Sequence, residues 1–480
     1  MSDQIHANYI NGEWLTGTTS IRNISPANIK DILGEYAQAD TAQVEQALDA
    51  AIVGQEQWQS SGLEQRYQVL TAIGDELIAR KSELGEQLAR EEGKTLAEGM
   101  GEVYRSGQFF HYYAAEALRQ MGETADSVRP GVEIETRREP VGVVAIITPW
   151  NFPMATAAWK IAPALAFGNS VVFKPANAVP ASAWSLTEII SRQQLPAGTF
   201  NLLMGSGATV GDALIHSAKI NALSFTGSVE TGRKVAAATA ANFVRCQLEM
   251  GSKNALVVLD DADLEQAVEC ALNGAFFGTG QKCTASSRLV VTAGIHDRFV
   301  SALVDRMKQL QVGYPLREGV QIGAVIDGKQ LEQNMRYIEQ AKADGAQLAF
   351  GGERIDEEYE GFYMRPALFV DTRNDMQINR DEVFGPIACV IKVADYEEAL
   401  STLNDTDFGL TAGIMTQSLK YSSDFKRRAK TGCVMINLPT AGTDYHVPFG
   451  GRKNSSFGPR EQGQYAREFY TVVKTTYIRA

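Results

Sequence analysis

Cys283 is the residue whose type and surroundings most directly suggest covalent chemistry. It stands alone in the stretch GTGQKCTASS (278–287), after a glycine-rich approach and before small or hydroxylated residues, with no second cysteine at metal-ligand or redox spacing. A free thiol has a pKa of about 8.5, so a nucleophilic Cys283 needs a base, a helix N-terminus or a nearby positive charge. By itself, the stretch is also compatible with a buried and inert cysteine.

Partners for such a thiol are scarce in the sequence. The usual base in thiol hydrolases is histidine, and none of the five histidines lies in a recognisable thiol-hydrolase context: they are His6, His111, His216, His296 and His446. Glu249, in QLEMGSKN, ends an apolar approach and could project a carboxylate into a cleft, or could be a solvated surface carboxylate. Asn151, in TPWNFP, could donate a hydrogen bond to an oxyanion, or could cap the helix that Pro153 begins.

Two glycine-containing turns are candidates for binding a dinucleotide. GSGATVG (205–211) departs by one residue from the usual fingerprint, whereas FTGSVETGRK (225–234) follows a strand, and Gly227 and Gly232 open a helix whose N-terminus could hold a phosphate. Both stretches are also compatible with ordinary strand-to-helix turns. Lys174 leaves a buried strand in FKPAN, where its charge must reach solvent or an anionic partner, and Glu382 and Phe384 lie on a turn in DEVFGP.

The elements that must position these residues follow from the hydrophobic pattern. Residues 41–120 have apolar positions at helical spacing, and residues 129–142 alternate as in strands or a hairpin. From residue 141, short apolar runs alternate with helical stretches, which predicts a parallel sheet that binds ligands at the carboxyl ends of its strands. A second series of this kind begins near residue 254, and residues 466–480 predict a strand that could pair at a sheet edge.

Length, charge and cysteine content limit the function classes. A chain of 480 residues is too long for one ordinary core, and its net charge of −12, without long charged runs, disfavours binding to nucleic acid or to an anionic membrane. No apolar run approaches the roughly 20 residues of a membrane span. The first residues do not resemble a signal peptide, and five widely spaced cysteines fit a reducing compartment, so we expect a cytoplasmic protein without disulfides. No cluster in the sequence predicts a metal site.

Seven stretches occur in an order that resembles the aldehyde dehydrogenase superfamily along essentially the whole chain: TPWNFP, FKPAN, FTGS, LEMGSKN, GQKCTASS, DEVFGP and VPFGG. The resemblance implies an α/β fold of the aldehyde dehydrogenase type. In this fold, residues 1–120 and 141–250 would form a Rossmann-like cofactor domain, residues 251–455 an α/β catalytic domain, and residues 121–140 and 456–480 a small β oligomerisation domain. It also implies a homodimer or homotetramer that acts on a small-molecule aldehyde.

The resemblance further implies roles for the candidate residues. Cys283 matches the nucleophile, Glu249 the general base, and Asn151 the oxyanion donor, assisted by the backbone N–H of Cys283. The implied reaction oxidises an aldehyde to a carboxylic acid through a cysteine thiohemiacetal and a thioester, with NADP or NAD as the hydride acceptor. The positions that match cofactor contacts are Thr148, Trp150, Lys174, Ala176, Asn177, Gly207, Phe225, Thr226, Gly227, Ser228, Thr231, Glu382 and Phe384.

Two departures from the family pattern bear on the site. The family often has Leu-Gly-Gly after the base, whereas this chain has Met250-Gly251-Ser252, so a Cβ is added near the base. Many NAD-specific members have a glutamate, which binds the ribose hydroxyls, at the position of Asn177. Because Asn177 is neutral and would not repel a 2′-phosphate, we expect NADP to be accepted and slightly favoured, with NAD also usable.

The C-terminal region narrows the resemblance. INLPTAGTDYHVPFGGRKNSSFGPREQGQYAREFYT (436–471) is similar to the α-ketoglutaric semialdehyde (2,5-dioxopentanoate) dehydrogenases, as is GQKCTASSRLVV. Such a substrate ends in a carboxylate, so we expect a cation in its tunnel. Arg105, which shares a helix face with Phe109 and Tyr112, is the main candidate, and a surface ion pair is its alternative role.

Other substrate contacts follow from the same resemblance. Lys282, beside the nucleophile, is a second candidate anchor, and the remaining expected contacts are Phe152, Trp159, Thr284 and Phe449. A succinate semialdehyde or broad aliphatic aldehyde dehydrogenase would differ only in such tunnel residues. A thiol acyltransferase or hydrolase, and a non-catalytic member of the family, are more distant alternatives.

Overall fold

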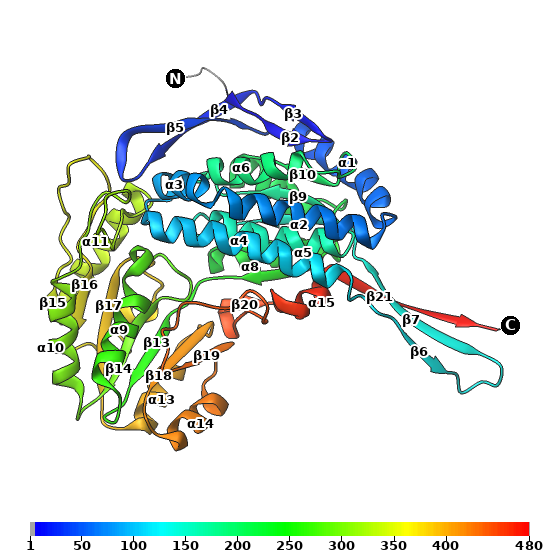
Figure 1. Cartoon of the computed structure of the whole chain (residues 1–480). Helices are drawn as coiled ribbons and strands as arrows, with labels where there is room; N and C mark the ends of the chain where they lie inside the picture. Colours follow the sequence, from blue (N-terminus) through cyan, green and yellow to red (C-terminus); the bar gives the residue numbers. More distant parts are fainter. Residues whose placement is uncertain (1–4, 480) are drawn as a thin grey trace.

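The computed structural model describes residues 5–479. Residues 1–4, at the start of the predicted range 1–120, and residue 480, at the end of the predicted range 456–480, lie outside the described residues. Two large sheets form the two main bodies of the molecule (Figure 1). The first has eight strands, in the order β20 (Ser456–Phe457), β12 (Arg245–Glu249), β11 (Ala222–Thr226), β8 (Val143–Ile147), β9 (Ser170–Lys174), β10 (Phe200–Leu202), β2 (Asn8–Ile10) and β3 (Glu13–Leu15).

Helices cover both faces of this sheet because its central strands are apolar on both sides. Val144 and Ile146 of β8 pack into one core, and Val143 and Ala145 pack into another. The first core is closed by α2 (Leu63–Ala79), α3 (Lys81–Glu92), α4 (Leu96–Ala117), α5 (Pro153–Ala166) and α6 (Pro180–Ser191). The second is closed by α1 (Thr41–Gln59), α7 (Asp212–His216) and α8 (Val229–Ala241). The helical character expected for residues 41–120 is confirmed.

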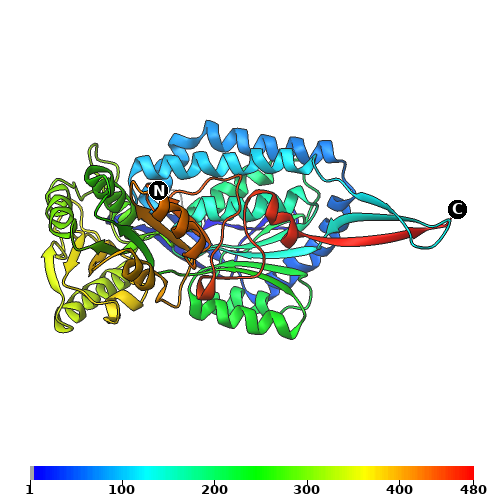
Figure 2. The same cartoon turned by 90° about the horizontal axis from the view of Figure 1, so that it is seen from below.

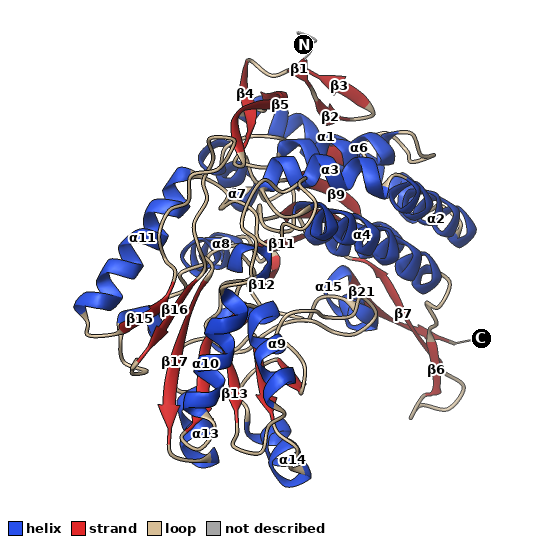
Figure 3. Ribbon diagram, turned by 60° about the vertical axis from the view of Figure 1, so that its left-hand side comes forward, coloured by secondary structure: helices blue, strands red, loops and turns tan. Residues whose placement is uncertain are grey.

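The second sheet has the same layered construction (Figure 3). Its seven strands lie in the order β15 (Gln347–Phe350), β16 (Ala367–Val370), β17 (Ile387–Val393), β14 (Ser286–Thr292), β13 (Asn254–Val258), β18 (Thr411–Met415) and β19 (Cys433–Ile436). All neighbours are parallel except β15 and β16. The accompanying helices are α9 (Leu264–Ala275), α10 (His296–Met307), α11 (Gly328–Ala343), α12 (Gln377–Arg380), α13 (Tyr396–Asn404) and α14 (Leu419–Arg428).

Strand register brings the predicted site residues to one edge of the eight-stranded sheet. Glu249, the last residue of β12, pairs with Thr226, the last residue of β11, and Ile147 at the end of β8 pairs with both Phe225 and Lys174. The carboxyl ends of these four parallel strands therefore meet. The chain then enters β13 at residue 254, and β14 begins three residues after Cys283. The thiol consequently lies where the carboxyl edge of one sheet faces the amino edge of the other.

A three-stranded antiparallel sheet extends away from the two bodies and carries the C-terminus near its tip (Figure 2). Its order is β21 (Thr471–Ile478), β7 (Glu133–Pro140) and β6 (Glu123–Asp126). Residues 456–470, which we expected to accompany this small sheet, lie instead with the first body. The reason is that β20 pairs with β12, and that Phe469 and Tyr470 of α15 (Arg467–Tyr470) pack into the core of the eight-stranded sheet. A further small sheet contains β1 (Ile5–His6), β5 (Asn28–Gln38) and β4 (Thr19–Ser25).

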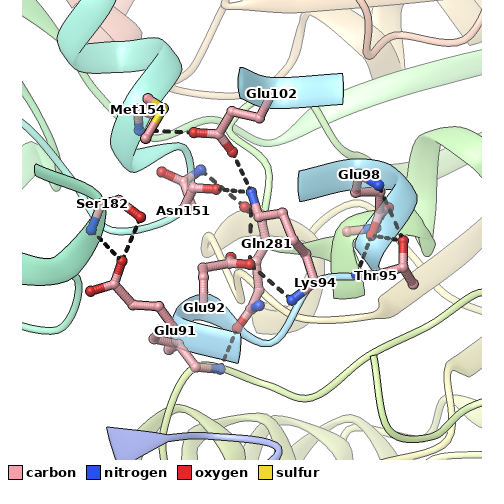
Figure 4. A network of polar contacts seen from close by, with 12 residues as sticks. Glu91, Glu92, Lys94, Thr95, Glu98, Glu102, Asn151, Met154, Ser182 and Gln281 are labelled. Atoms are coloured by element: carbon pink, nitrogen blue, oxygen red, sulfur yellow. Dashed lines mark hydrogen bonds and ion pairs between the residues drawn. The ribbon is translucent and has the colours of Figure 1, made fainter. Parts of the chain in front are cut away.

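Two helices of the first body receive their N-terminal caps from distant carboxylates. Helices α5 and α6 both begin with proline, and no side chain of their own N-cap residues is bonded to their free N–H groups. Glu102 of α4 accepts from the N–H groups of α5, and Glu91 of α3 accepts from those of α6 (Figure 4). Negative charge at a helix N-terminus is favourable, so these buried carboxylates orient α5 and α6 against α3 and α4.

Within residues 5–479, no helix combines the length and the apolar character needed to cross a membrane.

Candidate active site

Two cavities meet at Cys283. The first has a volume of about 280 Å³ and the second of about 330 Å³. Five residues line both, and Cys283 is among them; the others are Asn151, Phe152, Trp159 and Phe449. A small molecule in either cavity can therefore reach the same sulfur, which is the arrangement needed to pass a group from one ligand to another.

The predicted residues divide between the two cavities. The first cavity is also lined by Trp150, Thr226, Gly227, Ser228, Glu249, Glu382 and Phe384. The second is also lined by Arg105, Lys282 and Thr284. The remaining expected cofactor contacts line neither: Thr148, Lys174, Ala176, Asn177, Gly207, Phe225 and Thr231.

The loop that carries Cys283 is held by tight backbone turns. Gly278, Thr279 and Gly280 all have positive φ angles, of 64°, 54° and 63°. A Cβ on Gly280 would overlap the carbonyl group of Gly385, so only glycine permits this approach. Asn254 then donates its side-chain amide to the carbonyl oxygen of Cys283 at 2.7 Å, which ties the loop to the start of β13.

Burial sets the acidity of the Cys283 thiol. It raises the pKa of Cys283 to about 12, and the negative charges of Glu382 and then Glu249 add to the effect. The backbone N–H groups of Cys283 and Thr284 act in the opposite direction by donating to the sulfur. The thiol is therefore protonated at neutral pH, and a base must remove its proton when it reacts.

Glu249 is a buried carboxyl group at the end of β12. Burial and the nearby charge of Glu461 raise its pKa well above the usual range for a glutamate. The hydroxyl of Ser456 in β20 donates to this carboxyl group. Lys160 and Glu461 form a buried ion pair close by. A carboxyl group with a raised pKa is a stronger base when ionised, which suits it to removing a proton from water or a thiol.

Asn151 does not cap the helix that follows it. The N-cap position of α5 belongs to Phe152, and the amide nitrogen of Asn151 instead donates to the carbonyl oxygen of Gln281 at 2.9 Å. An amide NH₂ has two hydrogens, so one N–H remains for a ligand. Because Asn151 and Cys283 line the same two cavities, that N–H can serve an oxygen on a carbon attached to the sulfur.

The added Cβ at Ser252 is accommodated. The Ser252 N–H donates to Glu382 at 2.8 Å and its hydroxyl donates to Asn254 at 2.7 Å. A Cβ on the preceding Gly251 would overlap the Glu382 carboxyl group. The extra Cβ of this chain therefore lies at Ser252, where there is room for it, and not at Gly251, where there is none.

The first cavity has the features of a dinucleotide site. Helix α8 begins after Gly227 and Ser228, and its free N–H groups are suited to a phosphate. A Cβ on Gly227 would overlap the ring of Phe225, so the turn packs closely on the sheet. The hydroxyl of Thr226 is buried without a partner in the described structure, which leaves a polar atom for a ligand in this cavity. The hydroxyl of Thr148 is likewise buried without a partner, but Thr148 does not line the cavity.

Of the other expected cofactor residues, Trp150 and Phe384 line this cavity, whereas Lys174 and Asn177 lie outside it. The rings of Trp150 and Phe384 lie edge to face, 5.3 Å apart, and form an apolar wall for a flat group. Lys174 ends β9, where burial lowers the pKa of its ammonium group to about 8, and Asn177 is exposed three residues later. The ammonium donates to the carbonyl oxygen of Pro175 at 2.9 Å but has no anionic partner among the described residues, and a phosphate near Lys174 would supply one. The residues present thus fit a nicotinamide dinucleotide.

The second cavity holds a guanidinium group without an acidic partner. Among residues 5–479, Arg105 forms no ion pair, so the alternative role as a surface ion pair is not realised. Its guanidinium lies over the ring of Tyr445 at 5.4 Å. Phe109 and Tyr112, on the same face of α4, also contact Tyr445. Sequence patterns did not indicate Tyr445, because it lies in an irregular segment and is far from α4 along the chain.

Lys282 has a different orientation from the one expected of a carboxylate anchor. Its ammonium group donates to the carbonyl oxygen of Asn273 in α9 at 2.8 Å. Burial lowers its pKa to about 8. Within the described chain, no histidine lines either cavity, and no group of three or more acidic, cysteine or histidine side chains could hold a metal ion.

The charge of Glu382 yields a testable prediction about Cys283. Replacement by glutamine removes a negative charge that disfavours the thiolate, so we expect the pH midpoint for alkylation of Cys283 by iodoacetamide to move to lower pH. The rate is measured by peptide mass, because four other cysteines are present. Asp381→Asn, which removes the charge of the neighbouring carboxylate but keeps an oxygen that can accept from the Tyr337 hydroxyl, is the control and should leave the midpoint unchanged. Equal midpoints in Glu382→Gln and the unmodified protein would refute this account of the pKa.

Comparison with known proteins agrees with the geometry. The model of the aldehyde dehydrogenase family matches residues 14–476. The chain is 40% identical to an alpha-ketoglutaric semialdehyde dehydrogenase of Bacillus subtilis, over 99% of this chain and 98% of the relative. It is 39% identical to an alpha-ketoglutarate semialdehyde dehydrogenase of Haloferax volcanii, over 98% of each. It is also 38% identical to a betaine aldehyde dehydrogenase of B. subtilis, over 98% of this chain and 96% of the relative.

Solved structures give the same result. A betaine aldehyde dehydrogenase of Staphylococcus aureus in complex with NAD⁺ superposes with a TM-score of 0.96 and 34% identity, covering 99% of this chain and 95% of that one. An NADP-dependent enzyme of Escherichia coli superposes equally well, with 34% identity over 99% and 98% of the two chains. The fold expected from the sequence is confirmed. The chain belongs to the aldehyde dehydrogenase family, whose members are NAD(P)-dependent oxidoreductases.

Proposed function

We propose that this enzyme oxidises an aldehyde that carries a carboxylate, with α-ketoglutaric semialdehyde as the preferred substrate and 2-oxoglutarate as the product. The observation that carries the proposal is the Arg105 guanidinium, which lines the second cavity without an acidic partner among the described residues. A guanidinium can hold a carboxylate through two parallel hydrogen bonds. Two relatives that share 39–40% identity with this chain are named for the same substrate.

The proposed mechanism begins with the thiol. Cys283 gives up its proton to solvent water as the sulfur adds to the aldehyde carbon and the carbonyl π bond breaks, which forms a thiohemiacetal oxyanion. The free N–H of Asn151 and the backbone N–H of Cys283 donate to that oxyanion, in a site where burial makes such bonds strong. A nicotinamide dinucleotide, when bound in the first cavity, accepts the hydride that leaves the carbon.

The remaining steps release the acid. Loss of the hydride leaves a thioester on Cys283, and Glu249 takes a proton from a water molecule that attacks the thioester carbon. The carbon–sulfur bond then breaks, the carboxylic acid leaves, and the sulfur is restored. The raised pKa of Glu249 supports this role because it strengthens the carboxylate as a base. The same machinery would serve succinate semialdehyde or a neutral aldehyde, so the substrate depends on the second cavity.

A substrate panel tests this function directly. We expect kcat/KM, followed as cofactor reduction at 340 nm, to be highest for 2,5-dioxopentanoate, lower for succinate semialdehyde and glutarate semialdehyde, and lowest for pentanal. In Arg105→Met, kcat/KM for the acids should fall about 10- to 100-fold, mainly through KM, because a charge-assisted bond of about 1.5–3 kcal/mol is lost. Pentanal should be affected little.

Arg119→Met is the matched control for this variant. Arg119 follows the same helix but lies outside both cavities and pairs with Glu116 at 2.7 Å, so its loss should leave the whole panel unchanged. An Arg105→Met enzyme that loses activity equally on acids and pentanal would remove Arg105 from carboxylate binding. If kcat/KM were highest for succinate semialdehyde or for pentanal, that aldehyde would replace 2,5-dioxopentanoate as the proposed substrate.

For the cofactor, we propose that NADP is accepted and slightly favoured. The neutral, exposed Asn177 supports this because it offers no repulsion to a 2′-phosphate. Asn177→Glu should lower kcat/KM for NADP and leave that for NAD nearly unchanged, whereas Asn177→Gln should change neither. A preference of the unmodified enzyme for NAD by more than about a hundredfold, equivalent to about 2.7 kcal/mol, would contradict this proposal.

We also propose that the enzyme is a cytoplasmic homodimer or homotetramer that associates through the small sheet of β6, β7 and β21. We propose the three domains with the ranges given above, except that residues 456–470 belong to the cofactor domain and not to the oligomerisation domain. Exposed apolar side chains on the outer strand, Val473 and Tyr477, support the interface. Five cysteines without a disulfide support a reducing compartment.

A further inference from the structure

A buried ion pair lies directly behind the backbone of Asn151. The ammonium group of Lys94 is 2.7 Å from the Glu102 carboxylate, and both side chains are almost completely inaccessible. The ammonium also donates to the carbonyl oxygen of Asn151 at 2.7 Å and lies over the ring of Phe152 at 4.3 Å. Figure 4 shows this ammonium between the Glu102 carboxylate and the Asn151 carbonyl. One charged group therefore holds the peptide from which the Asn151 side chain projects.

The same ion pair fixes the chain just beyond Asn151. The second oxygen of Glu102 accepts from the N–H groups of Met154 and Ala155, at 2.9 and 3.1 Å. These are free N–H groups in the first turn of α5, so the carboxylate caps the helix that begins at Pro153. Lys94 and Glu102 thus hold both ends of the five residues from 151 to 155.

The side chain of Asn151 is fixed from the opposite direction. Its amide nitrogen donates to the carbonyl oxygen of Gln281, two residues before Cys283. Gln281 is itself held, because its side-chain oxygen accepts from the Ile326 N–H at 3.0 Å. With the carbonyl of Asn151 bound to Lys94 and one amide hydrogen bound to Gln281, the direction of the second amide hydrogen is determined.

We propose that Lys94 and Glu102 are positioning residues that aim the Asn151 amide at the oxygen of the Cys283 adduct. The inference rests on the oxyanion role proposed above for Asn151. Both residues also line the second cavity, but each reaches the reaction through the 151–155 segment. A donor displaced by about 1 Å can cost about a hundredfold in rate, so a rigid mount for this amide has a large kinetic consequence.

Stability alone does not account for the arrangement. A buried ion pair contributes little net stability compared with apolar side chains of the same volume, because desolvation offsets the attraction. The pair does fix the position of residues 151–155, because it makes three hydrogen bonds and one ring contact with them.

A double-mutant cycle tests the proposal. We would measure the single-turnover rate of cofactor reduction in Lys94→Met, in Asn151→Ala and in the double variant. Lys94→Met alone should be about 10- to 100-fold slower. In the Asn151→Ala background, the same change should slow the reaction less than about threefold, because the amide that Lys94 positions is already absent.

Separate outcomes distinguish the two proposals. If Asn151→Ala reacts at the rate of the unmodified enzyme, the oxyanion role fails. If Asn151→Ala is slow but Lys94→Met multiplies the loss in full, the oxyanion role survives and the positioning role fails. Alkylation of Cys283 by iodoacetamide, which creates no oxyanion, should proceed at the unmodified rate in Lys94→Met; a matching fall in alkylation would mean general disruption of the site and would overturn the proposal.

A second pair of variants guards against misfolding. Lys94→Met/Glu102→Gln removes both charges of the 2.7 Å pair, and it should be as slow as Lys94→Met. The buried Glu92, whose carboxylate lies 3.7 Å from the Lys94 ammonium, then loses its cation, but burial raises its pKa to about 8, so it stays protonated at neutral pH and leaves no unpaired buried charge. Glu91→Gln is the matched control, because Glu91 is an equally buried carboxylate that accepts from the N–H groups of Ala181 and Ser182 at the start of α6, away from the site. Glu91→Gln should keep the unmodified rate. An equal loss of rate in Glu91→Gln would refute a specific role for the Lys94–Glu102 pair.

Discussion

The thiol of Cys283 must ionise where ionisation is unfavourable, and the rest of the site is arranged around that constraint. Burial and the carboxyl groups of Glu382 and Glu249 raise its pKa to about 12. Burial of the Asn151 side chain also strengthens the hydrogen bond that it can offer to an oxyanion. In the proposed mechanism, a site that disfavours the resting thiolate favours the charge that develops after the sulfur has added to the aldehyde. The thiol is thereby kept from reacting unproductively and is used when substrate is present.

The fold meets this constraint by joining two sheets at one point. The carboxyl ends of β8, β9, β11 and β12 present the predicted cofactor contacts, and the loop before β14 brings the sulfur to the same edge. The two cavities therefore share a wall that contains Cys283. Helix α4 also contributes to the site, since it carries Arg105 at the second cavity and Glu102 at the start of α5.

Sequence patterns predicted the features that depend on local order. Helical spacing in residues 41–120 and the alternation of apolar runs after residue 141 correspond to helices and parallel strands of the structure. Cys283, Glu249 and Asn151 stood out because each lies in a short, distinctive stretch, and all three line one cavity. By contrast, Lys94, Glu102, Tyr445 and Ser456 carried no signal. Their contacts join residues that are far apart in the chain, and a single lysine or glutamate in a helical region is ordinarily a surface residue.

The placement of the C-terminal segment also depends on contacts between distant residues, which sequence patterns do not show. A strand was expected near the end of the chain, and β21 is present, but residues 456–470 return to the eight-stranded sheet through β20. A two-residue strand is too short to produce a periodic pattern. That return has a chemical consequence, because it brings the Ser456 hydroxyl to the carboxyl group of Glu249.

The covalent role of Cys283 is the central claim, and trapping the thioester tests it most directly. Glu249→Gln lacks the proposed base, so hydrolysis should be slower than acyl transfer. After mixing with 2,5-dioxopentanoate and NADP and quenching in acid, peptide mass analysis should find the acyl group on Cys283, in an amount equal to the NADPH formed in the first turnover. NADPH formation without an acyl group on Cys283, or an acyl group on another cysteine such as Cys433, would contradict the account.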